Sequence, residues 1–257
     1  MRPREFKQSM RDVLYLRRTG APLHALSRYF PSRFGHAPVA LQTYTELAVC
    51  YQARLSNLQT SNAWFTKNLP IWLSILAKWE KRLPESPPKH GLEIGSWEGV
   101  SAHFILSRMN SLHLTCVDTF EGADEHKNSE SASSSLGLIE DRFDRNLSEF
   151  AQVGRLTKEK TTSHSFLANC KKTYDFIYID GSHHAPAVVC DAMLAWQRLN
   201  SGGLMIFDDY LWKFYSHELD NPASAINYFL KLVKNESQIL FLWEQVFLLK
   251  QNPEESA

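Results

Sequence analysis

The sequence is poor in cysteine and has no long apolar run, and each shortage excludes a class of protein. It contains four cysteines, and no two of them form a CxxC pair. A disulfide framework and a zinc knuckle are therefore not expected. The nearest candidate for a membrane span, residues 239–249, is interrupted by Glu244 and Gln245 and is shorter than the roughly 20 residues that cross a bilayer. These features predict a reduced, cytoplasmic protein without a transmembrane segment.

The sequence also has no surplus of charge of one sign. Its 28 basic residues balance 28 acidic residues, whereas nucleic-acid-binding proteins usually need a basic surplus for phosphate contacts. No nucleic-acid partner is therefore expected. The first 35 residues are locally basic. They are consistent with a transit peptide or a membrane-surface helix, with a solvated helical extension, or with an arm packed on a partner subunit.

What is present is enough hydrophobic sequence for a large core. Hydrophobic residues make up 44% of the 257 residues, which suits one α/β domain with a modest extension. Residues 1–85 predict a helical N-terminal extension or cap, because apolar residues recur at helical spacing in 40–55 and 63–83. Three prolines in "PESPPKH" then separate this extension from a second region, residues 86–257.

Strand-like and helix-like segments alternate in this second region. Several expected strands are apolar on both faces, as in a parallel sheet covered on both sides, and the last two predict a hairpin at one edge. The pattern predicts an α/β fold with a doubly wound, mostly parallel seven-stranded sheet. The expected strands are 91–95, 112–118, 154–161, 174–180, 203–209, 238–244 and 245–251, and the expected helices are 100–109, 139–150, 186–199 and 223–235.

A glycine turn follows the first of these strands. In "LEIGSWEGVS", Glu93, Gly95, Ser96 and Gly99 lie at the end of the strand. Glycines let the backbone turn sharply and approach a ligand closely, and ligands of open α/β sheets lie at the carboxyl ends of the strands. The pattern lacks the middle glycine of a dinucleotide site. Asp118 ends the second strand, where an acid can accept hydrogen bonds from ribose hydroxyls. Together these residues indicate a nucleoside site without a diphosphate.

Three aspartates end two further strands that should be neighbours. Asp180 follows the fourth strand, and Asp208 and Asp209 follow the fifth. Three carboxylates in one pocket repel one another, and a divalent cation with a preference for oxygen ligands relieves that repulsion. Adjacent residues of a strand point to opposite faces, so Asp208 and Asp209 can share a metal only if the strand has already ended between them.

Over residues 88–251, these motifs resemble those of class I S-adenosylmethionine-dependent methyltransferases. The resemblance implies the Rossmann-like fold of that family. The resemblance implies that Gly95 and Gly99 bracket the methionine part of S-adenosylmethionine, near Glu93 and Ser96, and that Asp118 holds the ribose. It also implies adenine contacts for a further set of residues, namely Thr119, Phe120 and, as a weaker candidate, Ser163.

The segment "DFIYIDGSHHAPAVVCDAMLAWQRLNSGGLMIFDDY" resembles the macrocin-type O-methyltransferase branch. In this branch and in catechol-type enzymes, an acid after strand four and an acid pair after strand five bind Mg²⁺. The resemblance therefore implies a metal site formed by Asp180, Asp208 and Asp209. His183 lies three residues after Asp180 and is a candidate catalytic base together with it. Catechol-type enzymes have a lysine at that offset, so His183 can instead orient a metal ligand or cap the next helix.

The leading hypothesis is a metal-dependent O-methyltransferase that acts on a small-molecule hydroxyl, with a sugar or a glycosylated natural product as the substrate class that the resemblance implies. The alternatives are a metal-independent small-molecule methyltransferase and a non-catalytic binding protein on the same fold. We expect specificity to come from residues 1–85, 121–137 and 210–222. The apolar N-terminal helices would suit a homodimer.

Overall fold

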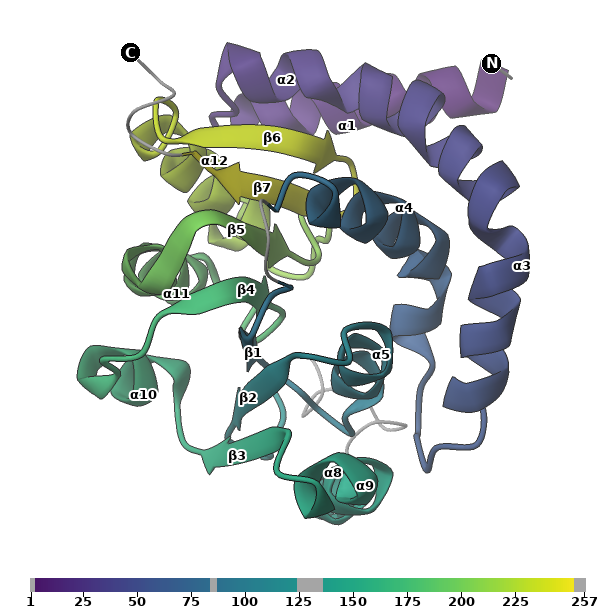
Figure 1. Cartoon of the computed structure of the whole chain (residues 1–257). Coiled ribbons are helices and arrows are strands. Elements are labelled where there is room, and N and C mark those ends of the chain that lie inside the picture. Colours follow the sequence, from purple (N-terminus) through teal and green to yellow (C-terminus); the bar gives the residue numbers. More distant parts are fainter. Residues whose placement is uncertain (1–2, 84–86, 124–135, 252–257) are drawn as a thin grey trace.

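A seven-stranded sheet is the centre of the computed structural model, which describes residues 3–83, 87–123 and 136–251 (Figure 1). The strand order is β3-β2-β1-β4-β5-β7-β6. The first five strands in this order pair in parallel, and β7 is antiparallel to both β5 and β6. The strands are β1 His90–Ile94, β2 His113–Asp118, β3 Leu156–Lys160, β4 Tyr174–Ile179, β5 Leu199–Phe207, β6 Ser237–Leu242 and β7 Val246–Lys250.

The predicted doubly wound, mostly parallel sheet is thus confirmed, including its closing hairpin. Most bounds differ from the predicted ones by no more than three residues, and two elements differ more. β5 begins at Leu199, four residues before the predicted start, and its pairing with β4 is irregular near Tyr174. The helix expected at 139–150 is two helices, α8 Ile139–Asn146 and α9 Ser148–Gln152, because Leu147 leaves the helical conformation with φ −112°.

Helices cover both faces of the sheet, each over its own hydrophobic cluster (Figure 1). One cluster buries side chains of α1 Pro3–Arg18, α2 Leu23–Phe30, α10 Ser163–Asn169, α11 Ala185–Arg198 and α12 Pro222–Leu232. The other buries side chains of α3 Ala37–Leu55, α4 Leu69–Glu80, α5 Val100–Arg108, α8 and α9. Short helical turns complete the chain at Pro31–His36, Trp64–Asn68, Leu136–Leu138 and Glu218–Asp220.

The expected N-terminal helical extension is present, and it packs on its own chain. Asp12, which is 6% exposed, accepts hydrogen bonds from Tyr29 and Arg33, each at 2.6 Å. Ser32 accepts a hydrogen bond of 2.9 Å from the backbone N–H of Leu242, in the edge strand β6. An uncovered edge strand invites pairing with other chains, so these helices shield one edge of the sheet. No described helix is long and apolar enough to cross a membrane.

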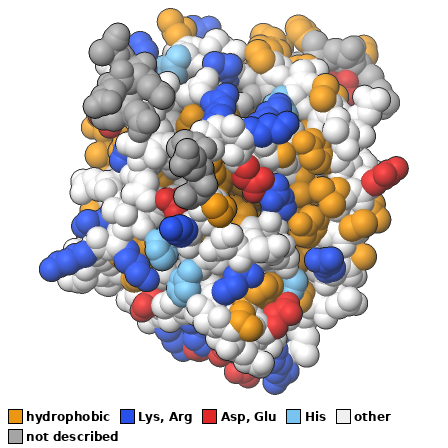
Figure 2. All heavy atoms as spheres, viewed as in Figure 1, with side chains coloured by type: hydrophobic (Ala, Val, Ile, Leu, Met, Phe, Trp, Pro, Cys, Tyr) orange, Lys and Arg blue, Asp and Glu red, His pale blue; other side chains and the backbone are white. Residues whose placement is uncertain are grey.

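Helix α3 leaves much of its apolar surface in solvent. Val39, Leu41, Leu47 and Val49 are each between 44% and 61% exposed. Figure 2 shows hydrophobic side chains gathered over α3 and α4, on the right of the view. Helix α4 is different, because its Trp72 is fully buried and donates a hydrogen bond of 2.9 Å from Nε1 to Gln245, beside β7. This contact fixes the end of the N-terminal region to the sheet.

Candidate active site

A cavity of about 920 Å³ opens at the carboxyl ends of the parallel strands. This is where ligands bind in open α/β sheets, and the volume is in the range of small-molecule sites. Its wall comes from β1, β2, β4 and β5 and from the segment 62–68. The lining residues discussed below are Asn62, Trp64, Phe65, Lys67, Asn68, Gly95, Ser96, Trp97, Glu98, Asp118, Thr119, Ser163, Asp180, His183, Asp208, Asp209 and Trp212.

The glycine turn after β1 is a tight backbone structure at the floor of this cavity. Gly95 and Gly99 both have φ +82°, and Trp97 between them has φ +48°, a region that side chains other than glycine rarely adopt. A Cβ atom at Gly95 would lie 2.1 Å from the carbonyl oxygen of Asp180. Glycine is therefore required here by conformation and by the closeness of the β4 backbone.

Asp118 holds this turn in place. One of its carboxylate oxygens accepts hydrogen bonds from the backbone N–H groups of Ser96 and Trp97, both at 2.8 Å. The other accepts from the backbone N–H of Phe120 at 2.7 Å. Each carboxylate oxygen has two lone pairs, so Asp118 can orient the turn and still accept from a ligand hydroxyl. The acid predicted for the ribose is thus also the brace of the glycine turn.

Glu93 lies behind the turn and does not line the cavity. It is fully buried, and the Cys116 thiol donates a 3.4 Å hydrogen bond to it. Burial raises the pKa of Glu93 to about 7, although the nearby Ser101 and Ser96 hydroxyls partly offset this effect. Glu93 is therefore positioned to support the turn from beneath rather than to touch a ligand in the cavity.

The remaining cofactor candidates divide into two groups. Ser96, Thr119 and Ser163 line the cavity as expected of ligand contacts. Gly99 and Phe120 are not among its lining residues: Gly99 is the N-cap of α5, and the Phe120 ring packs against Phe143 at 5.1 Å between centroids. The backbone of Phe120 has φ +58°, and its N–H donates to Asp118.

Three polar side chains converge beside the glycine turn. The Nε2 atom of His183 lies 3.4 Å from Oδ1 of Asp180 and 3.2 Å from Oδ2 of Asp209. Their ligand atoms lie within 4.8 Å of one another, close enough to share one metal ion. The strand β5 ends at Phe207, and Asp209 has φ +52°. The regular strand therefore does not continue from Asp208 to Asp209, as the predicted condition requires.

Asp208 takes a different place from the one predicted. It lines the cavity, but one carboxylate oxygen accepts a short hydrogen bond from the Tyr178 hydroxyl and the other accepts from the Asp209 backbone N–H at 2.7 Å. Tyr178 also lies 2.9 Å from Asp180. The group that could hold a metal therefore contains His183 where the sequence suggested Asp208. Burial, with Asp208 and Asp209 nearby, raises the pKa of Asp180 well above its ordinary value.

Sequence reasoning expected specificity from residues 1–85 but did not single out the wall 62–68. Trp64 is 52% exposed, and its ring lies 5.9 Å from that of Trp97 in the glycine turn. Burial lowers the pKa of Lys67, but Glu244, 3.4 Å away, outweighs this effect together with Asp208 and Asp209, so that the pKa is raised. Across the cavity the Trp212 ring lies 4.8 Å from His183. These residues carry no motif; only the fold places them here. Most of the loop 121–137 lies outside the described residues.

The strand order, the glycine turn after β1 and the acid after β2 define the class I methyltransferase fold. Residues 92–210 match the family model described as a methyltransferase domain. That segment holds the glycine turn, Asp118 and the acid cluster. The fold of the chain is therefore that of the class I methyltransferases, and the segment that matches the family model contains most of the residues that line the cavity just described.

Solved methyltransferase structures share this fold. TomG from Streptomyces achromogenes, an O-methyltransferase involved in tomaymycin synthesis and solved with SAM, is 10% identical, with a TM-score of 0.50 over 90% of this chain and 100% of that one. The SAH-bound methyltransferase PaMTH1 from Podospora anserina is 11% identical, with a TM-score of 0.51 over 85% and 97%. The O-methyltransferase NovP is 14% identical, with a TM-score of 0.50 over 65% and 73%. No curated protein matches the sequence.

Gly95→Ala should destabilise the protein far more than Gly154→Ala. Both glycines have positive φ, +82° and +70°, but nothing lies within 4 Å of a Cβ at Gly154. The control should therefore lose about 1–2 kcal/mol of unfolding free energy from backbone strain alone. Gly95→Ala must also push apart β1 and β4. Urea denaturation of the two variants measures the difference, and equal losses would contradict the close approach at Asp180.

Glu93 should make stability fall as pH rises. Its pKa is about 7 in the folded protein against 4.5 ordinarily, so between these values the folded state binds the proton that the unfolded state has lost. The free energy of unfolding of Glu93→Gln, relative to wild type, should therefore increase by about 2–3 kcal/mol between pH 5 and pH 8. Denaturant titrations at both pH values test this. Glu46→Gln, at an exposed site, is the control and should show no such trend.

Proposed function

We propose that this protein is an S-adenosylmethionine-dependent O-methyltransferase that methylates a small-molecule hydroxyl with the help of a divalent cation. The observation that carries the proposal is that the braced glycine turn and the Asp180–His183–Asp209 cluster face the same cavity. The first is suited to the cofactor and the second to the reacting hydroxyl. The fold alone does not establish turnover, so the proposal rests on this site.

The residues present fit the cofactor. Gly95 lets the turn lie directly against the Asp180 backbone at the cavity, and Asp118 retains lone pairs for ribose hydroxyls. Ser96, Thr119 and Ser163 offer hydroxyl or backbone groups along the same wall. Glu93 would support the turn from behind. When bound, S-adenosylmethionine would supply a methyl group on a positively charged sulfur.

The residues present also fit a divalent cation. Two carboxylates and one imidazole lie within 4.8 Å of one another, and burial together with the nearby Asp208 and Asp209 raises the pKa of Asp180, which supports a site that favours an added positive charge. A mixed oxygen and nitrogen set suits Mn²⁺, and Mg²⁺ remains the ion that the sequence resemblance implies. A bound cation would hold the substrate hydroxyl and lower its pKa. Asp208, hydrogen-bonded to Tyr178, would support the site from one side.

Proton removal would fall to Asp180 or His183. In the site without a cation, burial and its acidic neighbours raise the pKa of Asp180, so that it accepts a proton more readily than an ordinary aspartate. With a cation present, Nε2 of His183 would serve as a ligand. Without one, His183 would take the proton, and the carboxylates of Asp180 and Asp209 would stabilise the resulting imidazolium. This second arrangement is the metal-independent alternative.

The cavity wall supports a small-molecule substrate. Trp64, Trp97 and Trp212 offer ring faces, while Lys67 and the aspartates offer polar contacts. This mixture suits a polar molecule with an apolar face, such as a sugar or a glycosylated natural product. TomG, similar in fold, takes part in tomaymycin synthesis. The exposed apolar side chains of α3 support the expected homodimer. The cytoplasmic location stays a prediction.

Calorimetry of S-adenosylhomocysteine with and without EDTA tests the proposal. Wild type should bind with a micromolar dissociation constant, and Asp118→Asn should bind at least about tenfold more weakly because hydrogen bonds to a charged acceptor are lost. Asp175→Asn is the matched control: its carboxylate also accepts from two backbone N–H groups, those of Lys89 and His90, at the other end of the sheet. Titration with Mn²⁺ should give binding that Asp209→Asn weakens at least about tenfold.

The outcomes separate the three hypotheses. Absence of S-adenosylhomocysteine binding to wild type would overturn the methyltransferase proposal in favour of a binding protein. Cofactor binding without any Mn²⁺ or Mg²⁺ binding would favour the metal-independent enzyme.

A further inference from the structure

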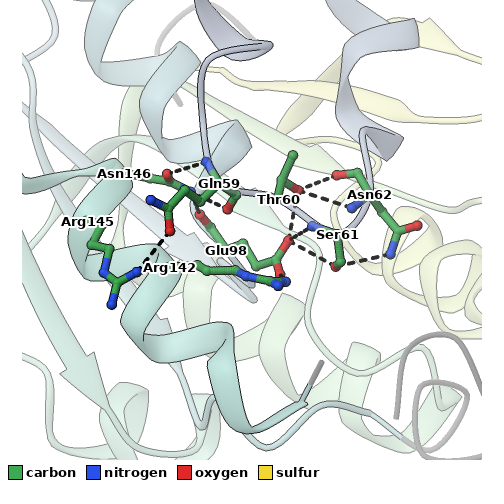
Figure 3. Close-up of polar contacts among 8 residues, drawn as sticks. All are labelled: Gln59, Thr60, Ser61, Asn62, Glu98, Arg142, Arg145 and Asn146. Atoms are coloured by element: carbon green, nitrogen blue, oxygen red, sulfur yellow. Dashed lines mark hydrogen bonds and ion pairs between the residues drawn. The ribbon is translucent and has the colours of Figure 1, made fainter. Parts of the chain in front are cut away.

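Glu98, inside the glycine turn, is the centre of a polar network that joins three segments of the chain (Figure 3). Its side chain is fully buried. One carboxylate oxygen lies 2.6 Å from the backbone nitrogen of Ser61, 3.0 Å from the Ser61 hydroxyl and 2.8 Å from the Thr60 hydroxyl. The other oxygen forms an ion pair with Arg142 of α8. The carboxylate is thus satisfied only when all three segments are in place.

Asn146, one turn further along α8, closes the network (Figure 3). Its amide nitrogen donates to the backbone oxygens of Glu98, at 2.8 Å, and of Gln59, at 3.0 Å. Its amide oxygen accepts from the backbone N–H of Gln59 at 2.8 Å. The segment 59–61 is therefore bound to the glycine turn both through Glu98 and through Asn146.

The segment 59–61 leads directly into the wall of the cavity. Asn62, Trp64, Phe65 and Lys67 follow it and line the same cavity as the glycine turn. The segment itself has no regular secondary structure, and Gln59 is exposed. Burying a carboxylate without hydrogen-bond donors costs much free energy. Glu98 therefore holds the segment 59–61 in place, although the side chains of this segment are polar and add little apolar packing.

We propose that Glu98 is a positioning residue. Through the segment 59–61, it fixes the substrate-side wall, residues 62–68, relative to the turn that holds the cofactor. The proposal rests on the proposed function for the identity of the cofactor, but the attachment of the wall does not depend on it. Because the turn and the wall share one carboxylate, a ligand that immobilises the turn also immobilises the wall. Binding of the cofactor therefore prepares the surface that receives the second substrate.

Glu98→Gln tests this directly. A glutamine amide has one acceptor and one donor end. If the amide oxygen of the glutamine faces Ser61, the amide NH₂ faces the guanidinium of Arg142, which is also a donor. If the amide is flipped, the NH₂ faces the N–H of Ser61, again a donor. In either orientation, one half of the network loses its hydrogen bonds. Hydrogen exchange of residues 59–68, followed by mass spectrometry with and without S-adenosylhomocysteine, reports on that opening.

In wild type, S-adenosylhomocysteine should slow exchange in residues 59–68. In Glu98→Gln, exchange of this segment should be at least about tenfold faster, and the ligand should no longer slow it. Glu80→Gln is the matched control, because Glu80 forms a comparable pair with Arg108, at 2.7 and 2.8 Å, outside the cavity lining. It should leave exchange at 59–68 and the ligand effect unchanged. Arg142→Lys, which keeps the charge, should preserve more of the protection than Arg142→Met.

Unchanged exchange of 59–68 in Glu98→Gln would overturn the proposal, as would an equal effect of Glu80→Gln. If Glu98→Gln does not fold, Ser61→Ala is the substitute, because it removes one hydroxyl donor and keeps the Glu98 carboxylate. Hydrogen exchange of residues 59–68 should be faster in Ser61→Ala than in wild type. Unchanged exchange would likewise overturn the proposal. A wild type that does not bind S-adenosylhomocysteine would overturn the proposed function. Exchange of the free proteins would still decide whether Glu98 fixes the wall.

Discussion

The backbones of β1 and β4 meet so closely at Gly95 and Asp180 that no side chain fits between them. The N–H of Asp180 donates to the carbonyl of Ile94 at 2.8 Å, which continues the pairing of the two strands to their last residues. This contact places the glycine turn and the acid cluster side by side. The two halves of the proposed chemistry are therefore adjacent because of strand pairing, before any ligand is present.

Four buried or half-buried acids surround this contact, and each is stabilised differently. Asp118 accepts backbone N–H groups, Glu98 pairs with Arg142, and Glu93 lies among hydroxyls and a thiol with its pKa raised to about 7. Asp180 lies close to His183 and to the Tyr178 hydroxyl, with two further aspartates near it. The first three shape the turn. Asp180 is the one whose surroundings favour an added positive charge.

The sheet was predictable from the sequence because its strands are apolar on both faces and separated by helical patterns. The glycine turn, Asp118 and Asp180 were predictable for a related reason: each follows a strand directly, and the carboxyl ends of parallel strands meet at one edge. The site was less predictable wherever it depends on side-chain direction. Whether His183 or Asp208 joins Asp180 and Asp209 is decided by the Tyr178 hydroxyl and by the backbone at Asp209.

The wall 62–68 and its attachment through Glu98 were not predictable, because they join residues far apart in the sequence that share no local pattern. Thr60 and Glu98 are 38 residues apart, and Glu98 and Arg142 are 44 apart. The packing of α3 and α4 against α5 brings the segment 59–61 near the glycine turn, where Glu98 and Asn146 bind it. Tertiary contacts of this kind carry no periodic signal in sequence.

The most direct measurement is a crystal structure of the protein grown with S-adenosylhomocysteine and Mn²⁺, with anomalous scattering collected for manganese. The account predicts the homocysteine end of the ligand at Gly95–Gly99, the ribose at Asp118, and an anomalous peak among Asp180, His183 and Asp209. A ligand bound elsewhere, or a manganese peak remote from these three residues with the ligand in place, would contradict it.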